Sequence, residues 1–433
     1  MRNHFYKYRL LIFLTVFAAH PLFSQSELQQ KIKSLPGIIS VEEINASGFY
    51  TEAFEVYFEQ PLDHNNMEGE KFAQRMYLSH IDVSQPIVLH TAGYNVDSNR
   101  VIELAEILQS NHLIVEHRYF GKSVPEQMKW KYLTVEQAAA DHHKIVETFK
   151  EIYDGKWITS GISKGGQTTI FHRYFYPDDV DASVAYVAPL NIAQEDPRIY
   201  SFLRTVGSEE CRENMIEFQR EVLKRKEDLL PLFKNKYQSL DYTYSLGDDE
   251  YIFEYVVLEY GFAFWQWQNE TCEEIPPVDA TNEVLFNHLI KCSPIKYLSD
   301  QGIKPIASFF YQAYAEIGYY GYDITDFRDL LTEIKEPTSK IFLPKGTDPE
   351  FNYPLMQKIN TWVQKEGNNM LFIYGEYDTW SAPAVQLTGE TNAVKMVKEG
   401  GSHRTRIKHF SDEEKEIIYN TLEKWLNIRI VQN

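Results

Sequence analysis

The sequence contains very little cysteine. Only three of its 433 residues are cysteines, namely Cys211, Cys272 and Cys292. One disulfide is possible in an oxidising compartment, but so few cysteines in so long a chain exclude a fold that depends on a disulfide framework. Their spacing also differs from that of structural zinc sites. We therefore expect a core held together by packing, and the pairing of the three cysteines stays open.

Basic residues are scarce as well. The chain has 43 Lys and Arg against 62 Asp and Glu, which gives a formal net charge of -19 at pH 7. Because phosphate binding needs positive charge, nucleic acid and anionic membrane surfaces are disfavoured as partners. Glycine (21) and proline (18) are too infrequent for collagen or low-complexity sequence, and a hydrophobic share of 43% is ordinary for a globular protein.

Long apolar runs are missing except near the start of the chain. Residues 10–19 are apolar and follow the basic residues Arg2, Lys7 and Arg9. The run is only about ten residues long, which is too short for a spanning helix and typical of a secretory signal peptide. We expect residues 1–24 to be removed and the mature protein to be secreted or periplasmic, without membrane association. An uncleaved segment that anchors the protein is the alternative.

The pattern of apolar residues predicts an α/β fold. Residues 49–82 read as antiparallel β-structure, with strands at 55–58 and 74–81. Strands and helices then alternate, which is typical of a parallel sheet with crossover helices. The predicted strands are 86–90, 113–116, 157–159 and 182–188, and the predicted helices are 101–108, 133–153 and 166–176.

A long helical stretch, residues 196–342, then interrupts the alternation. Two further strands are predicted at 370–374 and 393–397. Ser411 and Glu414 form a capping box at the start of a final helix. The simplest account is one catalytic domain, residues 25–195 and 343–433, whose sheet is interrupted by a helical cap.

A serine motif lies where the sheet pattern places a sharp turn. Residues 161–165 read G-I-S-K-G between a predicted strand and a predicted helix. This is the G-x-S-x-G motif in the context of a nucleophile elbow, where the turn is so tight that side chains two positions either side of the serine would collide. Ser163 is therefore the expected nucleophile, and a glycine-rich turn without chemistry is the alternative.

A catalytic serine needs a histidine that takes its proton and an acid that orients this histidine. In α/β-hydrolases the acid and then the histidine follow the serine, each after a strand. Asp378 and His403 follow the last two predicted strands in that order. We expect them to complete a triad with Ser163. Glu376 is the alternative acid, and His409 is the rival base.

The oxyanion of an acyl intermediate needs backbone amides as donors. One normally comes from the residue after the nucleophile, here Lys164, and another from the loop after an earlier strand. That loop contains Gly93 and Tyr94, and small residues there let the backbone approach a substrate. We expect Lys164 to act with Gly93 or Tyr94, although a simple β-to-α turn explains the loop equally well.

No cofactor or metal motif accompanies this site. Asp141, His142 and His143 are adjacent on a predicted helix, but consecutive histidines diverge and H-E-x-x-H spacing is missing. We interpret them as helix-surface and packing residues. Neither G-x-G-x-x-G nor a P-loop occurs, so we expect no cofactor. The aromatic run 262–267 is interpreted mainly as core of the insertion.

Several segments together resemble a known family. They are Phe58, Q-P-L-D-H at 60–64, Gln74 with Arg75, E-H-R-Y at 116–119, Trp157, G-I-S-K-G-G at 161–166, Y-P-D-D-V-D at 176–181, Y-V-A-P at 186–189, F-W-Q at 264–266 with Cys272, Y-Q-A-Y-A-E-I-G at 311–318 and Y-G-E-Y-D-T-W at 374–380. The chain resembles the secreted prolyl tripeptidyl and tetrapeptidyl aminopeptidases, which are serine peptidases related to lysosomal Pro-X carboxypeptidase. The resemblance covers nearly the whole mature chain.

The resemblance implies an α/β-hydrolase fold with a mainly helical cap inserted between the nucleophile and acid strands. It also implies that Ser163, Asp378 and His403 form the triad and that Trp380 is an aromatic wall of a proline pocket. One departure is visible, because Thr379 stands where relatives usually have proline. A flat prolyl ring without an N–H suits such an aromatic slot.

The implied function is that of a serine exopeptidase that releases short peptides ending in proline from free N-termini, without a metal. Such an enzyme needs a buried or cap-borne carboxylate for the protonated N-terminus, and Glu316 is the candidate, with a structural ion pair as the alternative. Competing hypotheses are an esterase or lipase, another proline-specific carboxypeptidase or dipeptidyl-peptidase, and an inactive binding module. A lipase lid should be apolar, whereas residues 196–342 carry charged runs.

Overall fold

The computed structural model describes residues 25–431. The predicted signal peptide, residues 1–24, lies outside the described residues. Within the described range, no helix combines the length and the apolar character that crossing a membrane requires.

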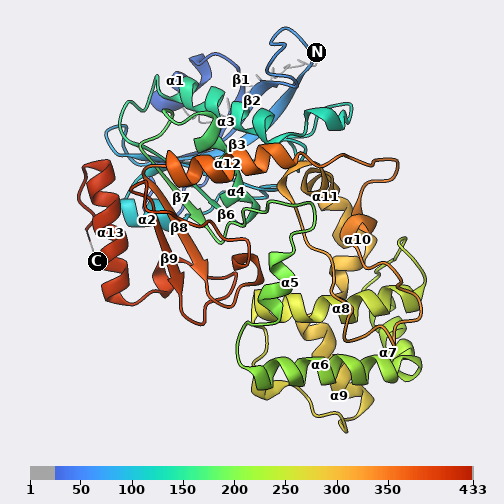
Figure 1. The fold of residues 1–433 in the computed structure, drawn as a ribbon. Helices are drawn as coiled ribbons and strands as arrows, with labels where there is room; N and C mark the ends of the chain where they lie inside the picture. Colours follow the sequence, from blue (N-terminus) through green and yellow to red (C-terminus); the bar gives the residue numbers. More distant parts are fainter. Residues whose placement is uncertain (1–24, 432–433) are drawn as a thin grey trace, which may run out of the picture.

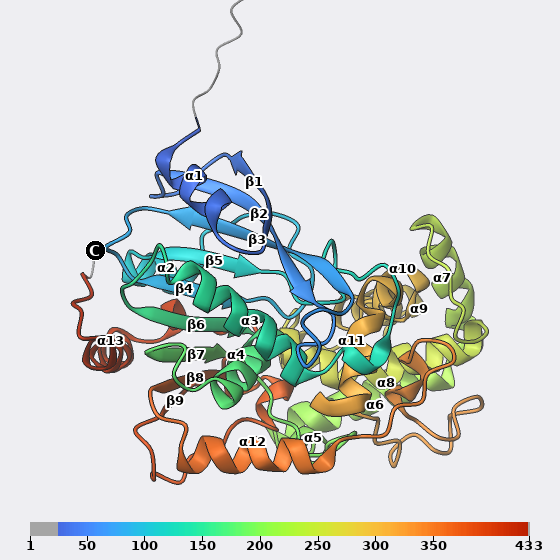
Figure 2. The same ribbon diagram turned by 90° about the horizontal axis from the view of Figure 1, so that it is seen from above.

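A nine-stranded sheet runs through the described part of the chain in the order β1-β2-β3-β5-β4-β6-β7-β8-β9 (Figures 1 and 2). Its strands are β1 (Ile38–Ile44), β2 (Glu52–Pro61), β3 (Lys71–His80), β4 (Ile87–Thr91), β5 (Asn111–Val115), β6 (Trp157–Ile162), β7 (Ala182–Tyr186), β8 (Met370–Gly375) and β9 (Val394–Lys398). Antiparallel pairing joins β1, β2, β3 and β5, and all pairs from β5 to β9 in the sheet order are parallel. This is an α/β-hydrolase fold, with β6 near the centre of the sheet.

Helices cover both faces of this sheet. They are α1 (Glu27–Ser34), α2 (Glu103–Leu108), α3 (Val135–Phe149), α4 (Lys164–Phe175), α12 (Tyr353–Lys365) and α13 (Asp412–Leu426). Side chains alternate along a strand, so Ile87 and Leu89 enter the buried cluster beneath α3, whereas Val88 enters the cluster beneath α2 and α13. The predicted capping box of Ser411 and Glu414 is confirmed at the start of α13.

The cap, residues 196–342, is mainly helical. It contains α5 (Arg198–Leu203), α6 (Glu209–Lys224), α7 (Lys226–Ser239), α8 (Asp249–Trp267), α9 (Asn282–Cys292), α10 (Asp300–Ile303), α11 (Ala307–Gln312) and a π-helix (Ala313–Ile317). In Figure 1 the helices α5 to α9 lie together to one side of the sheet.

The cap shares its core with the sheet domain. One continuous buried cluster joins Ile170 of α4 and Phe372 of β8 to Phe218 of α6 and Leu258 of α8. Packing of this kind is expected when an insertion has no independent core. A disulfide between Cys211 and Cys272 ties α6 to the segment that follows α8, while Cys292 is free and buried.

All strands predicted between residues 55 and 397 are confirmed, with ends that differ by a few residues. The elements β1, α1 and α12 were not predicted. The edge strand β1 buries only one of its seven residues, Val41, so the alternation that marks a half-buried strand is weak there. Helix α12 lies beyond the predicted end of the cap and packs against α4.

Candidate active site

Ser163 occupies the sharp turn between β6 and α4. Its φ of 57° and ψ of -124° are strained for a residue with a side chain, and such strain is concentrated at functional sites. A Cβ on Gly161 would lie 2.1 Å from the carbonyl oxygen of Gly165, and a Cβ on Gly165 would lie 2.5 Å from that of Thr91. The tight strand, turn and helix predicted from G-x-S-x-G are therefore confirmed.

Asp378 and His403 lie on neighbouring loops after β8 and β9. The Nδ1 atom of His403 is 2.7 Å from Oδ2 of Asp378, and Oδ1 of Asp378 accepts a hydrogen bond from the backbone N–H of Trp380 at 3.1 Å. Asp378 is fully buried, and His403 nearly so. The backbone N–H of His403 donates to the carbonyl of Gln266, 2.9 Å away in α8. The acid thus orients the imidazole, and the cap supports its loop.

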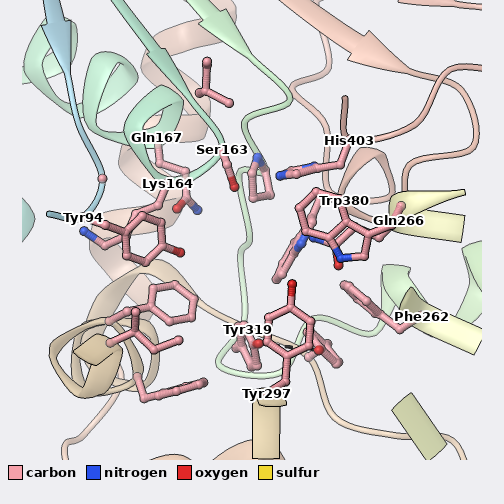
Figure 3. Close-up of a pocket in the computed structure, with 18 of the residues that line it drawn as sticks. Tyr94, Ser163, Lys164, Gln167, Phe262, Gln266, Tyr297, Tyr319, Trp380 and His403 are labelled. Atoms are coloured by element: carbon pink, nitrogen blue, oxygen red, sulfur yellow. Dashed lines mark hydrogen bonds between the residues drawn. The ribbon is translucent and has the colours of Figure 1, made fainter. Parts of the chain in front are cut away.

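Ser163 and His403 both line a cavity of about 560 Å³ between the sheet and the cap. Figure 3 shows the Ser163 hydroxyl and the His403 ring on one side of this cavity, with Phe262, Tyr297 and Tyr319 across from them. The fold thus brings the predicted nucleophile and base to one cavity, whose lining is rich in aromatic side chains.

The loop that carries Gly93 and Tyr94 presses against the start of α4. A Cβ on Gly93 would lie 2.6 Å from the backbone nitrogen of Gly165 and 2.7 Å from Cβ of Lys164. Gly93, Tyr94 and Lys164 all line the cavity next to Ser163. The structure therefore brings together the segments whose amides were expected to bind an oxyanion.

The Lys164 side chain is buried among aromatic rings. Its Nζ lies 5.7 Å from the ring centroid of Tyr94 and 5.0 Å from that of Phe120. Burial lowers the pKa of this ammonium group well below its usual range. The sequence indicated a role for the Lys164 amide only, and the contacts of its Nζ with the rings of Tyr94 and Phe120 are an addition from the fold.

Trp380 forms one wall of the cavity and packs within an aromatic cluster. The rings of Phe262 and Tyr320 stack at a centroid distance of 3.7 Å and meet Trp380 edge-on at 5.2 and 5.5 Å. Phe262 belongs to the run 262–267, which we interpreted mainly as core. It also lines the cavity, so this run contributes to the site as well as to packing.

Glu259 is a cavity-lining residue that sequence reasoning missed. Its carboxylate accepts hydrogen bonds from the hydroxyl of Tyr322 at 2.9 Å and from that of Tyr320 at 3.0 Å. Burial raises the pKa of Glu259 to about 7, although the two hydroxyl donors act in the opposite direction. A signal was present, because Glu259, Phe262 and Gln266 are spaced to share one face of a helix.

Glu316 is placed differently from the expectation. It does not belong to the cavity lining, and its Oε2 accepts a hydrogen bond from the backbone N–H of Val135 at 2.7 Å. Val135 is the first residue of α3, where a carboxylate satisfies an amide left free by the helix and interacts favourably with the helix dipole. The structure thus argues against Glu316 as the substrate-binding carboxylate.

The alternative acid and base lie outside the cavity lining. Glu376 accepts a hydrogen bond from the backbone N–H of Gly400 at 2.8 Å, and Nδ1 of His409 accepts one from the backbone N–H of Arg406 at 2.9 Å. Both residues therefore stabilise loops rather than contact the predicted nucleophile.

Asp141 is buried rather than on the helix surface. Its carboxylate accepts hydrogen bonds from Nε of Arg118 at 2.7 Å and lies 2.7 Å from Nε2 of His64. His142 is buried too, with Nδ1 lying 2.7 Å from the carbonyl oxygen of Ala138. The packing role is confirmed for these two residues, and the surface position is wrong.

His143 joins a separate network with Asp179. The ligand atoms of His143, Glu147 and Asp179 lie within 4.8 Å of one another, a geometry that could hold a metal ion. Asp179 is also 2.9 Å from His172. Burial alone would raise the pKa of Asp179, but hydrogen bonds from the two histidines lower it to about 2. Histidine–aspartate pairing thus accounts for this cluster.

The chain is similar to known proteins. The sequence model described as PS-10 peptidase S37 matches residues 23–428. The chain is 29% identical over 423 residues to prolyl tri/tetrapeptidyl aminopeptidase of Streptomyces mobaraensis, covering 96% of this chain and 88% of that protein. It is 27% identical over 156 residues to lysosomal Pro-X carboxypeptidase of Mus musculus, covering 31% of this chain and 32% of that one. Among solved structures, it is similar to proline iminopeptidase of Mycobacterium smegmatis, with a TM-score of 0.44, 12% identity and coverage of 86% and 99%.

Proposed function

Because the chain belongs to the PS-10 peptidase S37 family of serine peptidases, we propose that Ser163, His403 and Asp378 are its catalytic triad and that it cleaves peptides after proline. The observation that carries this proposal is the buried pairing of His403 with Asp378 at 2.7 Å, at the cavity that Ser163 also lines. The order of the three residues along the chain is that of an α/β-hydrolase.

The proposed mechanism is acyl transfer. Oγ of Ser163 attacks the carbonyl carbon of the prolyl residue while His403 takes the hydroxyl proton, and His403 then gives this proton to the leaving amine. Asp378 holds the imidazole in the required orientation. A water molecule, deprotonated by His403, hydrolyses the acyl-enzyme and regenerates Ser163. The amides of Lys164 and of Gly93 or Tyr94 stabilise the oxyanion in both steps.

The aromatic cluster supports selectivity for proline. Trp380 and Phe262 line the cavity beside the triad and present flat apolar faces and edges. A prolyl residue lacks an N–H and has a compact apolar ring, so such a wall binds it without leaving a donor unpaired.

The direction of attack is proposed from the full-length similarity to the Streptomyces mobaraensis protein. We propose an aminopeptidase that releases tripeptides or tetrapeptides ending in proline from a free N-terminus. The basic and apolar pattern of residues 1–24 supports export, to the periplasm or the medium.

A pair of reporters tests the proposal. The purified protein is incubated with Ala-Ala-Pro-p-nitroanilide and with p-nitrophenyl esters of fatty acids, and Ser163→Ala serves as the control. We expect release of nitroaniline from the peptide by the wild type alone. Hydrolysis of the esters without cleavage of the peptide would favour the esterase hypothesis, and full activity of Ser163→Ala would remove the nucleophile assignment.

A further inference from the structure

Glu259 is a carboxyl group in the cavity that the catalytic steps do not use. It lies on α8, is 8% exposed and lines the cavity together with Tyr320 and Tyr322. Its contacts are the two tyrosine hydroxyls at 2.9 and 3.0 Å. A carboxylate in an enclosed aromatic environment is costly to keep charged unless a cation accompanies it.

No cation of the described chain accompanies Glu259. Burial raises the pKa of Glu259, and the hydroxyls of Tyr320 and Tyr322 lower it. No lysine, arginine or histidine contributes to this shift. Two hydroxyl donors leave lone pairs of the carboxylate unused, since an ionised carboxylate accepts about four hydrogen bonds. The site can therefore accept a cationic donor from a ligand.

The arginines of the cavity lie elsewhere. Arg404 and Arg406 follow His403 along the chain, and Arg100 lies between β4 and α2, whereas Glu259 is in the cap. The arginines of the lining thus belong to loops of the sheet domain, and the lysine of the lining, Lys164, begins α4 of the same domain.

The position of Glu259 along α8 suits a short peptide. Gln266 is level with the triad, because its carbonyl accepts a hydrogen bond from the backbone N–H of His403 at 2.9 Å. The seven residues from Glu259 to Gln266 correspond to about 10 Å of helix rise. Three to four extended residues span roughly 10–14 Å, which matches a tripeptide or tetrapeptide between its N-terminus and the scissile carbonyl.

We propose that Glu259, held by Tyr320 and Tyr322, binds the α-ammonium group of the peptide substrate and so restricts the enzyme to free N-termini. This inference rests on the proposed peptidase function and adds the residue that would select the substrate's end. It also disfavours carboxypeptidase activity at this position, since a substrate carboxylate would be repelled by Glu259.

The test compares two substrates that differ only in the ammonium group. They are Ala-Ala-Pro-p-nitroanilide and its propionyl-Ala-Pro counterpart, in which hydrogen replaces the amine. We expect the wild type to prefer the free amine by at least about 30-fold in kcat/KM. Glu259→Gln should reduce this preference to about threefold or less and leave cleavage of the propionyl substrate unchanged.

A matched control comes from the same helix. Glu250 is half-exposed, lies 3.5 Å from Lys226 and does not line the cavity. Glu250→Gln should therefore keep the wild-type preference. An equal loss for both substrates in Glu259→Gln would show a structural role and overturn the proposal, as would an unchanged preference.

The outcomes separate the inference from the proposed function. If the wild type cleaves both substrates equally, the aminopeptidase function fails and the ammonium site with it. If the wild type prefers the free amine but Glu259→Gln does so equally, only the ammonium site fails. Should Glu259→Gln not fold, the same ratio is measured on the wild type as a function of pH, and a ratio that does not fall on acidification overturns the inference.

Discussion

Nδ1 of His403 lies 2.7 Å from Oδ2 of Asp378, and both side chains are buried. Solvent therefore does not screen the interaction between them. An imidazole that gains a proton during acyl transfer is stabilised by an acid in this position. The pairing depends on two loops, after β8 and β9, that the sheet places side by side.

Asp378→Asn is the sharpest test of this pairing. The amide keeps the shape of the side chain but favours the wrong tautomer of His403, so we expect kcat to fall by about four orders of magnitude. Steady-state cleavage of Ala-Ala-Pro-p-nitroanilide measures the effect, and a melting curve confirms folding. Glu376→Gln is the control. A comparable fall of kcat in this variant would indicate that Glu376, and not Asp378, is the catalytic acid.

Gly93→Ala tests the oxyanion loop. The new Cβ would lie 2.6 Å from the backbone nitrogen of Gly165, so the loop would have to move away from the start of α4. Loss of one well-placed oxyanion donor typically lowers kcat by about 100-fold or more, and we expect that magnitude here with a smaller change in KM. Gly155→Ala is the control, because the new Cβ would come no closer than 3.9 Å to its nearest neighbour, the carbonyl oxygen of Gln85. Equal kcat values in the two variants would contradict an oxyanion role for this loop.

Reduction of the Cys211–Cys272 disulfide should destabilise the cap. The bond closes a loop with a sequence separation of 61 residues, and removal of such a cross-link costs about 2–4 kcal/mol of unfolding free energy. Because α8 lies within this loop and carries Glu259 and Phe262, KM should rise as well. Denaturant unfolding of Cys211→Ser with Cys272→Ser measures the effect, with Cys292→Ala as the control. Identical unfolding curves for the double variant and the wild type would show that packing alone holds the cap.

The preference for a free amine should depend on pH through Glu259. Its pKa is raised to about 7 by burial, so in the free enzyme the carboxyl is neutral below that pH and anionic above it. The groups that face it are Tyr297, Tyr319, Tyr320 and Tyr322, whose pKa values burial raises, so they stay neutral. We therefore expect the kcat/KM ratio of free-amine to propionyl substrate to fall as pH drops through about 7. Titration of the triad cancels in this ratio. Glu259→Gln should give a flat profile.

The free energy of unfolding should also depend on the ionisation of Glu259. Here the ionised form, which binds the substrate ammonium group, is the one that destabilises the fold. A carboxyl whose folded pKa exceeds its unfolded value destabilises the fold when it is ionised, so the penalty is full above about pH 7 and absent below about pH 4.5. Glu259→Gln should therefore be more stable than the wild type at alkaline pH, by up to about 3 kcal/mol, and equal to it in acid. Denaturant unfolding at several pH values checks this sign, and a destabilised variant at alkaline pH would contradict it.

Local signals predicted much of the fold, and they indicated the three residues that we propose as the triad. The requirement for glycine at position 161 comes from Gly165, four residues along the chain, and the capping box joins Ser411 to Glu414, three residues along. The strands before Asp378 and His403 are short buried runs that the pattern shows directly. By contrast, β1 escaped prediction because an exposed edge strand buries too little to leave a pattern.

The sequence by itself determined the nucleophile turn, the order of acid and base, and the presence of a helical insertion, because each depends on neighbours close along the chain. Only the tertiary structure decided which glutamate of the cap faces the cavity. Glu259 and Glu316 are both buried and both have raised pKa values, yet one meets Tyr320 and Tyr322 from a segment some sixty residues away and the other meets the first amide of α3. The environment of a carboxylate depends on the elements packed around it, and these contacts form only when the whole chain has folded.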